Sequence, residues 1–510
     1  MRKTRILIDK FSQEKVVLNF ITFLLVAQPL LDVCSYFLLK TGDTTLTTIL
    51  RTLMFVGIVF YTFVISDHKK VYYVFYGVVG IYWILHMVNC FRIGYQSPMS
   101  DCANFLRAVQ MPALTISFIT VLKKGSRMSK QIQMGFLINI IIILTVIVLS
   151  YLMGMPEYTY GNYIKIGVMG WFGVHNAQSA IVMLLVPLVL YFVYKMQNKC
   201  FFFLSAVACF GLLFFTGTRL TFYSIFIVAA AFLFLMAINR EKQWFYYAVF
   251  LATIVIGVTC VNYSPMYQRN QMQMQSYDNY NYQDGIESNT TTEIKSQQKT
   301  EIVSITQENT TIASNTPIQN STISAIENYN SIYNNLAGGF LADLINHFGI
   351  EKVAAAYDYS TDTEVLLNAR TKKLVFAKLS WEQQDFITKC VGYEYSTLLT
   401  DKEIYMPEND FPSLFYFFGY IGTGLYLAFI LYFVVLIIRQ MLKGLRNVFS
   451  IESGIICVTF LLLLGAAQLS GNVLFRPNVS IYLSIILAYL YHLFQFYDDA
   501  EKSVSSMEGI

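Results

Sequence analysis

The chain has 510 residues, of which 55% are hydrophobic and only 13% are charged, and its formal net charge is +4. An ordinary soluble domain has roughly a quarter of its residues charged, so this composition excludes a water-soluble globular protein. Helices of about 20 apolar residues satisfy their own backbone polar groups and can cross a bilayer. The sequence therefore predicts an all-α, polytopic membrane protein.

Twelve segments have the length and hydropathy of a transmembrane helix. In chain order, the predicted spans are 17–39, 45–65, 70–90, 105–122, 132–153, 174–194, 200–216, 220–238, 243–262, 411–438, 452–470 and 479–497. We expect a nine-helix portion over 1–262, a three-helix portion over 411–497 and a cytoplasmic tail over 498–510.

Basic residues in the short connections orient these spans. Connections on the side of the N-terminus hold most of the Lys and Arg, whereas those on the other side hold few. Because cytoplasmic loops are enriched in Lys and Arg, we expect a multi-pass protein of the cytoplasmic membrane with both termini in the cytoplasm. The long segment between spans nine and ten then lies outside.

That outer segment, residues 263–410, carries 10 Lys and Arg against 19 Asp and Glu. The basic balance of the chain therefore reflects cytoplasmic loops and does not indicate nucleic-acid binding. Residues 263–332 are polar and lack aliphatic periodicity, which predicts a flexible insert. Helical periodicity returns over 333–410, which predicts a mostly helical extracytoplasmic cap.

Five arginines are placed at outer-leaflet depth or in the cap: Arg51, Arg107, Arg219, Arg370 and Arg476. An arginine at a span faces protein, water or an anion, and its forked guanidinium suits phosphate oxygens. Arg51 and Arg107 have the alternative of snorkelling to lipid headgroups. Arg219 follows Gly217 at the junction of two spans, so it either contacts an anion beside helix N-terminal amides or lies in an ordinary solvated turn.

A second group of polar residues, Glu408, Asn409 and Asp410, lies where the cap re-enters the membrane. Glu408 and Asp410 are candidates for a general base toward an acceptor hydroxyl. Alternatively, they cap the next helix and place charge at its positive end. The two carboxylates need not share one role.

Polar residues also occur inside two spans. His175 and Asn176, with Gln178, lie at the outer end of the sixth span, where they either line a cavity or bond between helices. Asp32 lies in the first span beside Gln28, and its cost there predicts a polar partner.

No set of Cys or His shows metal-ligand spacing, and no phosphate-binding glycine loop occurs. We therefore expect no cofactor and no metal. Cys90 and Cys102 flank one predicted outer loop and are candidates for one disulfide, but a single pair is not a disulfide framework.

Three stretches stand out together: GWFGVHNAQSAIVMLLVP, FFTGTRLTFYS, and a cap containing NART, CVGYEYS and PENDFPSLFYFFGYIGTGLYL. By their order, spacing and topology they resemble the O-antigen ligase and polymerase family. Members of that family are integral membrane glycosyltransferases that act on undecaprenyl-diphosphate-linked glycans. The resemblance implies that Arg219 and Arg370 clamp the donor diphosphate. The family's ligases often carry a His-Asn pair where this chain has Glu408 and Asn409, so the base would be Glu408 or Asp410.

The replacement of the His-Asn pair by Glu408 and Asn409 favours a capsule or wall-polysaccharide polymerase or ligase. The resemblance implies that such an enzyme works without nucleotide on the outer face of the membrane. Its partners would be a lipid-linked glycan donor, a glycan acceptor and, in the cell, export or chain-length proteins. The alternative is a lipid-linked oligosaccharide flippase or other transporter, which the lopsided division of spans and the absence of an internal repeat disfavour. The candidate substrate-binding residues are Arg219, Arg370, Asn176, His175, Asn409 and Arg107.

Overall fold

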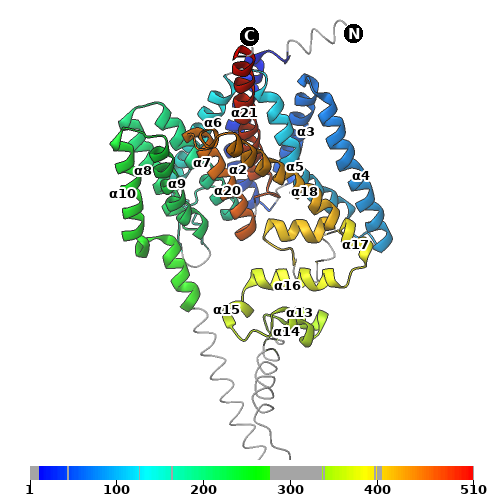
Figure 1. Cartoon of the computed structure of the whole chain (residues 1–510). Coiled ribbons are helices and arrows are strands. Elements are labelled where there is room, and N and C mark those ends of the chain that lie inside the picture. The colour runs from blue at the N-terminus through cyan, green and yellow to red at the C-terminus, as the bar shows by residue number, and fades with distance from the viewer. Residues whose placement is uncertain are drawn as a thin grey trace, which may run out of the picture. The chain divides into compact units, whose positions relative to one another are not determined.

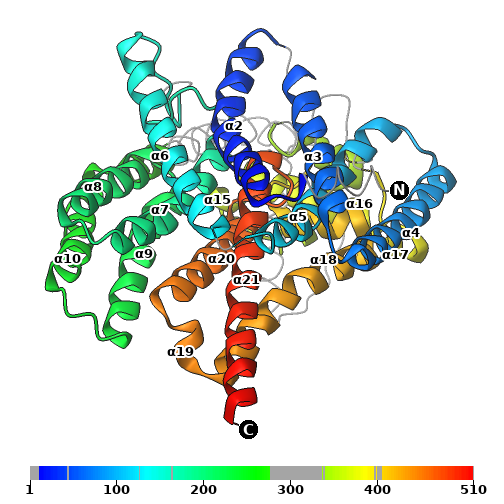
Figure 2. The same cartoon turned by 90° about the horizontal axis from the view of Figure 1, so that it is seen from above.

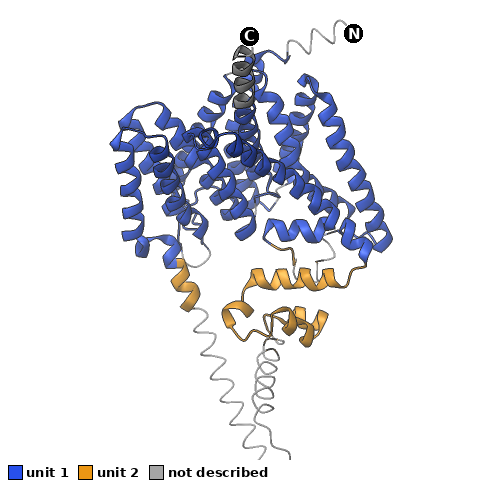
Figure 3. Cartoon of the chain, in the orientation of Figure 1, with its two compact units in different colours: residues 1–268, 386–396, 408–510 blue, residues 269–385, 397–407 orange. Residues whose placement is uncertain are grey.

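The computed structural model describes residues 11–275 and 339–508, except 43–44, 126, 162–164, 395–397, 399–404 and 472, together with Tyr333 and Leu336. The chain forms two compact units (Figure 3). Unit 1 comprises residues 1–268, 386–396 and 408–510, and unit 2 comprises residues 269–385 and 397–407.

Unit 1 is a bundle of helices, and eleven helices in the described part of the chain are long and apolar enough to cross a membrane. They are α2 (Glu14–Lys40), α3 (Thr45–Ile65), α4 (Lys69–Ile93), α5 (Pro98–Leu122), α6 (Met128–Leu152), α7 (His175–Lys195), α8 (Lys199–Thr216), α9 (Arg219–Ile238), α18 (Asp410–Lys443), α20 (Ile451–Leu469) and α21 (Pro477–Glu508). The short helices α17 (Phe386–Val391) and α19 (Leu445–Val448) also belong to this unit. The prediction of an all-α, polytopic membrane protein is confirmed.

The predicted span 243–262 is the shorter helix α10 (Trp244–Thr259), which is followed by the 3-10 helix η1 (Val261–Tyr263). Its 16 residues reach about 24 Å at the rise of an α-helix, less than the roughly 30 Å of hydrocarbon in a bilayer. The count of full-length candidate spans is therefore eleven among the described residues, not the expected twelve. α10 packs against α9 through stacked Phe232 and Phe250 rings, whose centroids are 4.6 Å apart.

Alternate connections of unit 1 meet at opposite ends of the bundle. At the end where α2 begins and α21 finishes (Figure 1), Lys124 pairs with Asp67 at 2.8 Å. The Asn239 side chain donates to the carbonyl oxygen of Phe449 at 2.7 Å at this end too. We call this the proximal end, and the end at which α7, α9, α18 and α21 begin the distal end. The helices thus alternate in direction, as the predicted topology requires.

α7 is the central helix of its half of the bundle (Figure 2). Its apolar stretch is entirely buried, and it packs against α6, α8, α9, α20 and α21. A helix that is apolar on all sides is covered on all sides. Groups at the N-terminus of α7 are consequently held in place by several neighbouring helices.

α18 is broken at Gly419, whose φ of 62° and ψ of −170° are not helical. The carbonyl oxygens of the two residues before it accept hydrogen bonds from the N–H of Tyr393 at 3.2 Å and the hydroxyl of Tyr82 at 2.8 Å. A side chain at this glycine would collide with the backbone of residues 389–392. The break therefore anchors the segment 386–396 within unit 1.

Unit 2 contains α13 (Ala342–Phe348), α14 (Ile350–Ala356), α15 (Thr363–Leu366) and α16 (Ala369–Glu382). The Tyr405 ring stacks on Phe376 with centroids 4.1 Å apart, and its hydroxyl donates to Asp343 at 3.0 Å. The helices in this part of the predicted cap agree with its helical periodicity. Of the predicted insert 263–332, residues 265–275 are helical, whereas residues 276–332 lie outside the described residues.

Candidate functional site

Arg219 begins α9 directly after the turn that ends α8. Gly217 makes this turn with a φ of 79°, and a Cβ there would lie 2.8 Å from the Cβ of Pro265, so both backbone and space require glycine. Thr218 is the N-cap of α9, and its hydroxyl oxygen accepts the N–H of Thr221 at 3.3 Å. The Arg219 side chain is exposed. The predicted tight turn that places Arg219 beside helix N-terminal amides is confirmed.

The first turn of α7 lies next to the first turn of α9. The hydroxyl of Thr218 donates to that of Ser179 at 3.2 Å, and Ser179 donates to the carbonyl oxygen of His175 at 2.7 Å. His175 is exposed and Asn176 is half-buried at the start of α7. Two helix N-termini, each with a partial positive charge, therefore lie side by side near Arg219.

A buried amide lies within this same part of α7. Gln178 is 5% exposed, and its Nε2 has no hydrogen-bond partner among the described residues. An unsatisfied buried donor costs about 1–3 kcal/mol. The amide is therefore an unsatisfied donor buried within the first turns of α7.

Asp410 opens α18 and is 3% exposed. Its Oδ2 accepts the backbone N–H of Val473 at 2.8 Å and that of Leu474 at 3.0 Å. The carboxylate thus holds the loop before α21 and lies at the positive end of α18. Asn409 is the N-cap of α18 and makes no side-chain cap bond, so Asp410 does not cap this helix, and only the expected negative charge at its positive end matches.

Glu408 lies outside the helix, two residues before Asp410, and is half-buried. Between them, Asn409 donates from its side chain to the carbonyl oxygen of Gln468 at 2.7 Å. Gly471 packs so closely on this segment that a Cβ added at Gly471 would lie 1.8 Å from the carbonyl oxygen of Glu408. The backbone that carries Glu408 is therefore fixed against the end of α20, and the two carboxylates have different surroundings.

Arg476 and Arg107 influence one another at the distal end. The side chain of Gln110, one turn after Arg107 on α5, donates to the carbonyl oxygen of Pro477 at 2.9 Å. The pKa of Arg476 is lowered, mainly because the surrounding protein displaces water from the guanidinium and also because Arg107 repels it. The Asp410 carboxylate raises the same pKa. Both arginine side chains are nevertheless exposed. Arg476, which was not among the predicted binding residues, therefore lies within electrostatic range of both Arg107 and the Asp410 carboxylate.

The residues around Arg219 and the residues around Glu408 both lie toward the C-terminal end of α20. This helix packs against α7 and α9, and at its start Glu452 accepts a hydrogen bond from the hydroxyl of Tyr191, near the end of α7, at 2.8 Å. Leu235, near the end of α9, packs on Gly454. α20 therefore runs antiparallel to both helices, and its last turn lies toward their first turns. The structure thus gathers Arg219, His175, Asn176, Glu408, Asn409, Asp410, Arg107 and Arg476 at the distal end.

Arg51 is paired within the bundle. Its Nη2 donates to Asp32 Oδ1 at 2.6 Å, and the side chain of Asn478 donates to the same oxygen at 3.0 Å. Both charged side chains are largely buried, at 13% and 10% exposed. The predicted polar partner of Asp32 is confirmed. Asp32 neutralises Arg51, which joins α2, α3 and α21.

Arg51→Met is expected to lower the free energy of unfolding by about 3–5 kcal/mol, because it leaves the Asp32 carboxylate without its counter-charge. The double variant Asp32→Asn/Arg51→Met removes both charges and is expected to recover most of that loss. Thermal unfolding of the purified protein in detergent measures both effects. Equal destabilisation of Arg51→Met and the double variant would contradict the prediction, because removing the Asp32 charge would then recover no stability.

Arg370 belongs to unit 2 and lies in the first turn of α16. The side-chain oxygen of the N-cap Asn368 accepts the backbone N–H of Arg370 at 3.0 Å and that of Thr371 at 3.4 Å. The Arg370 side chain is exposed. Its predicted approach to Arg219 joins residues of two units and stays a prediction.

One family model matches nearly the whole chain. It is described as O-antigen ligase like membrane protein, and the match extends over residues 13–495. It therefore includes all eleven candidate membrane spans in whole or in large part. No curated protein matches the chain.

Proposed function

The chain belongs to the family of O-antigen ligase-like membrane proteins, and from this membership we propose that it transfers a glycan from a lipid diphosphate to an acceptor on the outer face of the cytoplasmic membrane. The family supports a multi-pass membrane enzyme of polysaccharide biosynthesis. We further propose that the donor is an undecaprenyl-diphosphate-linked oligosaccharide and that the distal end faces outward. The basic connections at the proximal end support this orientation.

The observation that carries the proposal is the pair of adjacent helix N-termini beside Arg219. Backbone N–H groups at a helix start and a forked guanidinium both bind phosphate oxygens. In this proposal, Arg219 and the first turns of α7 and α9 hold the donor diphosphate. Arg107 and Arg476 supply further positive charge at the same end. The resemblance to the family implies that Arg370 also binds the diphosphate, and this stays a separate prediction.

The polar groups around this anion site suit the sugars. In this proposal the exposed His175 and the half-buried Asn176 bind glycan hydroxyls. Asn409 is placed to position the acceptor, since the end of α20 fixes its side chain. These assignments make the distal end a combined donor and acceptor site.

The reaction needs a base and a stabilised leaving group. An acceptor hydroxyl attacks the anomeric carbon, its oxygen forms the new glycosidic bond, and the bond from that carbon to the diphosphate oxygen breaks. Glu408 takes the hydroxyl proton, and the arginines stabilise the negative charge of the departing lipid diphosphate. Asp410 is assigned a positioning role, because two backbone N–H groups already occupy one of its oxygens.

Reconstitution tests the proposal directly. Full-length protein in liposomes is supplied with short undecaprenyl-diphosphate-linked oligosaccharide and no nucleotide sugar. We expect longer lipid-linked glycan and free undecaprenyl diphosphate, both measured by mass spectrometry. Oligosaccharide that crosses the bilayer without changing length would overturn the enzyme proposal and support the transporter.

A further inference from the structure

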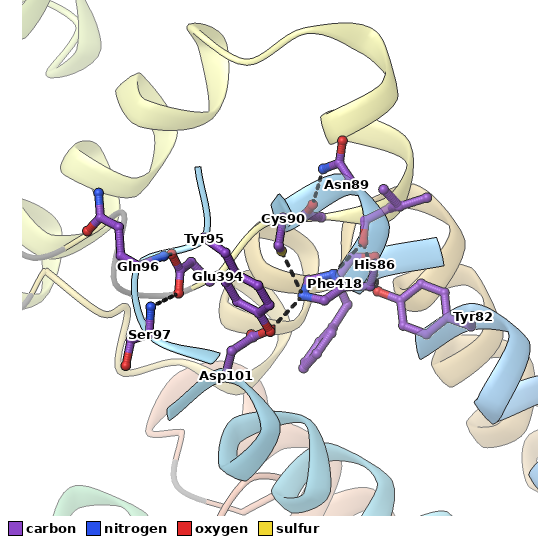
Figure 4. Close-up of polar contacts among 12 residues, drawn as sticks. Tyr82, His86, Asn89, Cys90, Tyr95, Gln96, Ser97, Asp101, Glu394 and Phe418 are labelled. Atoms are coloured by element: carbon purple, nitrogen blue, oxygen red, sulfur yellow. Dashed lines mark hydrogen bonds and ion pairs between the residues drawn. The ribbon is translucent and has the colours of Figure 1, made fainter. Parts of the chain in front are cut away.

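Three buried side chains with metal-binding atoms meet where α4 ends and α5 begins (Figure 4). His86 and Cys90 lie one helical turn apart on α4, and Asp101 lies in the first turn of α5. Their exposed fractions are 0%, 0% and 1%. The imidazole nitrogen, the thiol sulfur and a carboxylate oxygen all lie within 4.8 Å of one another.

Two of the three donor separations match the edges of a tetrahedron of zinc ligands. The Nε2 of His86 is 3.2 Å from the Oδ2 of Asp101 and 3.5 Å from the Sγ of Cys90. Zinc holds nitrogen and oxygen at roughly 2.0–2.2 Å and sulfur at roughly 2.3 Å, which at tetrahedral angles separates N from O by about 3.4 Å and N from S by about 3.6 Å. The third separation, from the Sγ to the carboxylate oxygen, is within 4.8 Å, so a small movement of one side chain brings all three donors onto one ion.

The His86 ring is oriented as in a metal-bound histidine. Its Nδ1 lies 2.8 Å from the carbonyl oxygen of Val391, and a carbonyl only accepts, so Nδ1 carries the proton. In the neutral ring, Nε2 then turns its lone pair toward Asp101 and Cys90, the arrangement that a backbone carbonyl commonly enforces on a metal ligand.

A hydrogen-bonded ion pair explains the cluster less completely. A protonated Nε2 points at one acceptor, whereas this nitrogen faces both Asp101 and Cys90. The 3.2 Å separation of His86 and Asp101 is also longer than the roughly 2.7–2.9 Å of a charge-assisted hydrogen bond. The hydroxyl of Tyr95 donates to the Asp101 Oδ2 at 2.6 Å and holds the carboxylate in place.

We propose that His86, Cys90 and Asp101 bind one zinc ion, with the fourth position taken by water. A thiolate and a carboxylate together supply two negative charges, so a divalent cation leaves the buried site neutral. Mixed sulfur, nitrogen and oxygen donors select zinc over magnesium or calcium.

The ion would join α4, α5 and the segment 386–396, because Val391 holds the His86 ring. Its role is structural and separate from the proposed glycan site. The proposal replaces the expectation of no metal, since the one-turn spacing of His86 and Cys90 is a ligand spacing that sequence reasoning overlooked.

Metal content and a cobalt spectrum test the site. Full-length protein, purified without a polyhistidine tag or chelator from zinc-supplemented cells, is expected to carry about one zinc per chain, measured by mass spectrometry of the metal. Replacement of zinc by Co²⁺ is expected to give thiolate-to-cobalt charge-transfer absorption. Cys90→Ser should abolish that absorption, and His86→Gln and Asp101→Asn should lower the zinc content several-fold.

Cys102→Ser is the matched control, because Cys102 is the next residue after Asp101 and is a free thiol, as is Cys90. We expect it to keep both zinc and the cobalt absorption. A wild-type protein without zinc and without the cobalt band would overturn the proposal, as would a band that persists in Cys90→Ser. The wild-type spectrum is decisive by itself if a variant fails to fold.

Discussion

Arg219→Ala is expected to lower the rate of glycan transfer by about two orders of magnitude or more, since losing one preorganised charge-stabilising donor typically costs 10²–10³-fold. The variant should keep its thermal stability, because Gly217 and the Thr218 cap form the turn without the arginine side chain. The initial rate of lipid-linked product formation in liposomes measures the first effect. Thermal unfolding in detergent measures the second.

Two control variants show whether the loss of rate in Arg219→Ala is specific to this guanidinium. Arg219→Lys keeps the charge but loses the forked geometry, so we expect a rate between those of the alanine variant and the wild type. Arg446→Ala removes an exposed arginine on α19, close to the start of α20 at the proximal end, and should leave the rate unchanged. An unchanged rate in Arg219→Ala would remove this residue from the donor site.

Local sequence was sufficient for most of the membrane helices. Hydropathy predicted the span 45–65, and α3 runs from Thr45 to Ile65. The turn at Gly217 was predictable for the same reason, because glycine between two apolar runs is itself a local feature. Features set by neighbours in sequence were therefore recovered.

Features set by distant contacts were not recovered. The break in α18 at Gly419 depends on the backbone of residues 389–392, which fills the space that a side chain would need. α5 begins at Pro98, before the predicted span 105–122, and its first turn carries Asp101, whose buried partner His86 on α4 a hydropathy profile does not register. The same hairpin brings Asp101 to His86 and Cys90, so the proposed metal site required the packing of two helices.

The pairing of Arg51 shows that the candidate site, too, combines features set by local sequence with features set by distant contacts. The sequence indicated that Asp32 needs a polar partner, and it left Arg51 either to snorkel to headgroups or to face an anion, until the structure joined Arg51 to Asp32. That pairing neutralises one arginine. The mutual repulsion of Arg107 and Arg476 at the distal end was likewise not predictable from their separation in sequence.

Glu408→Gln and Asp410→Asn are expected to fail in different ways, although the two residues are neighbours in sequence. Glu408→Gln removes the proposed base at nearly constant size, so the transfer rate should fall by about 10²–10⁴-fold with little change in melting temperature. Asp410→Asn loses a charged acceptor of two backbone N–H groups, so unfolding should become about 1.5–3 kcal/mol easier. Rates and melting temperatures of both purified variants measure the contrast.

Glu408→Asp separates the chemistry of the carboxylate from its position. A base must reach the acceptor hydroxyl, and the shorter side chain withdraws the carboxylate from a backbone that Asn409 and Gly471 hold in place. The rate of this variant should therefore exceed that of Glu408→Gln yet stay below the wild type. An active Glu408→Gln together with an inactive but fully stable Asp410→Asn would exchange the two roles. Asp410 would then take the proton while its Oδ2 also accepts the Val473 and Leu474 amides.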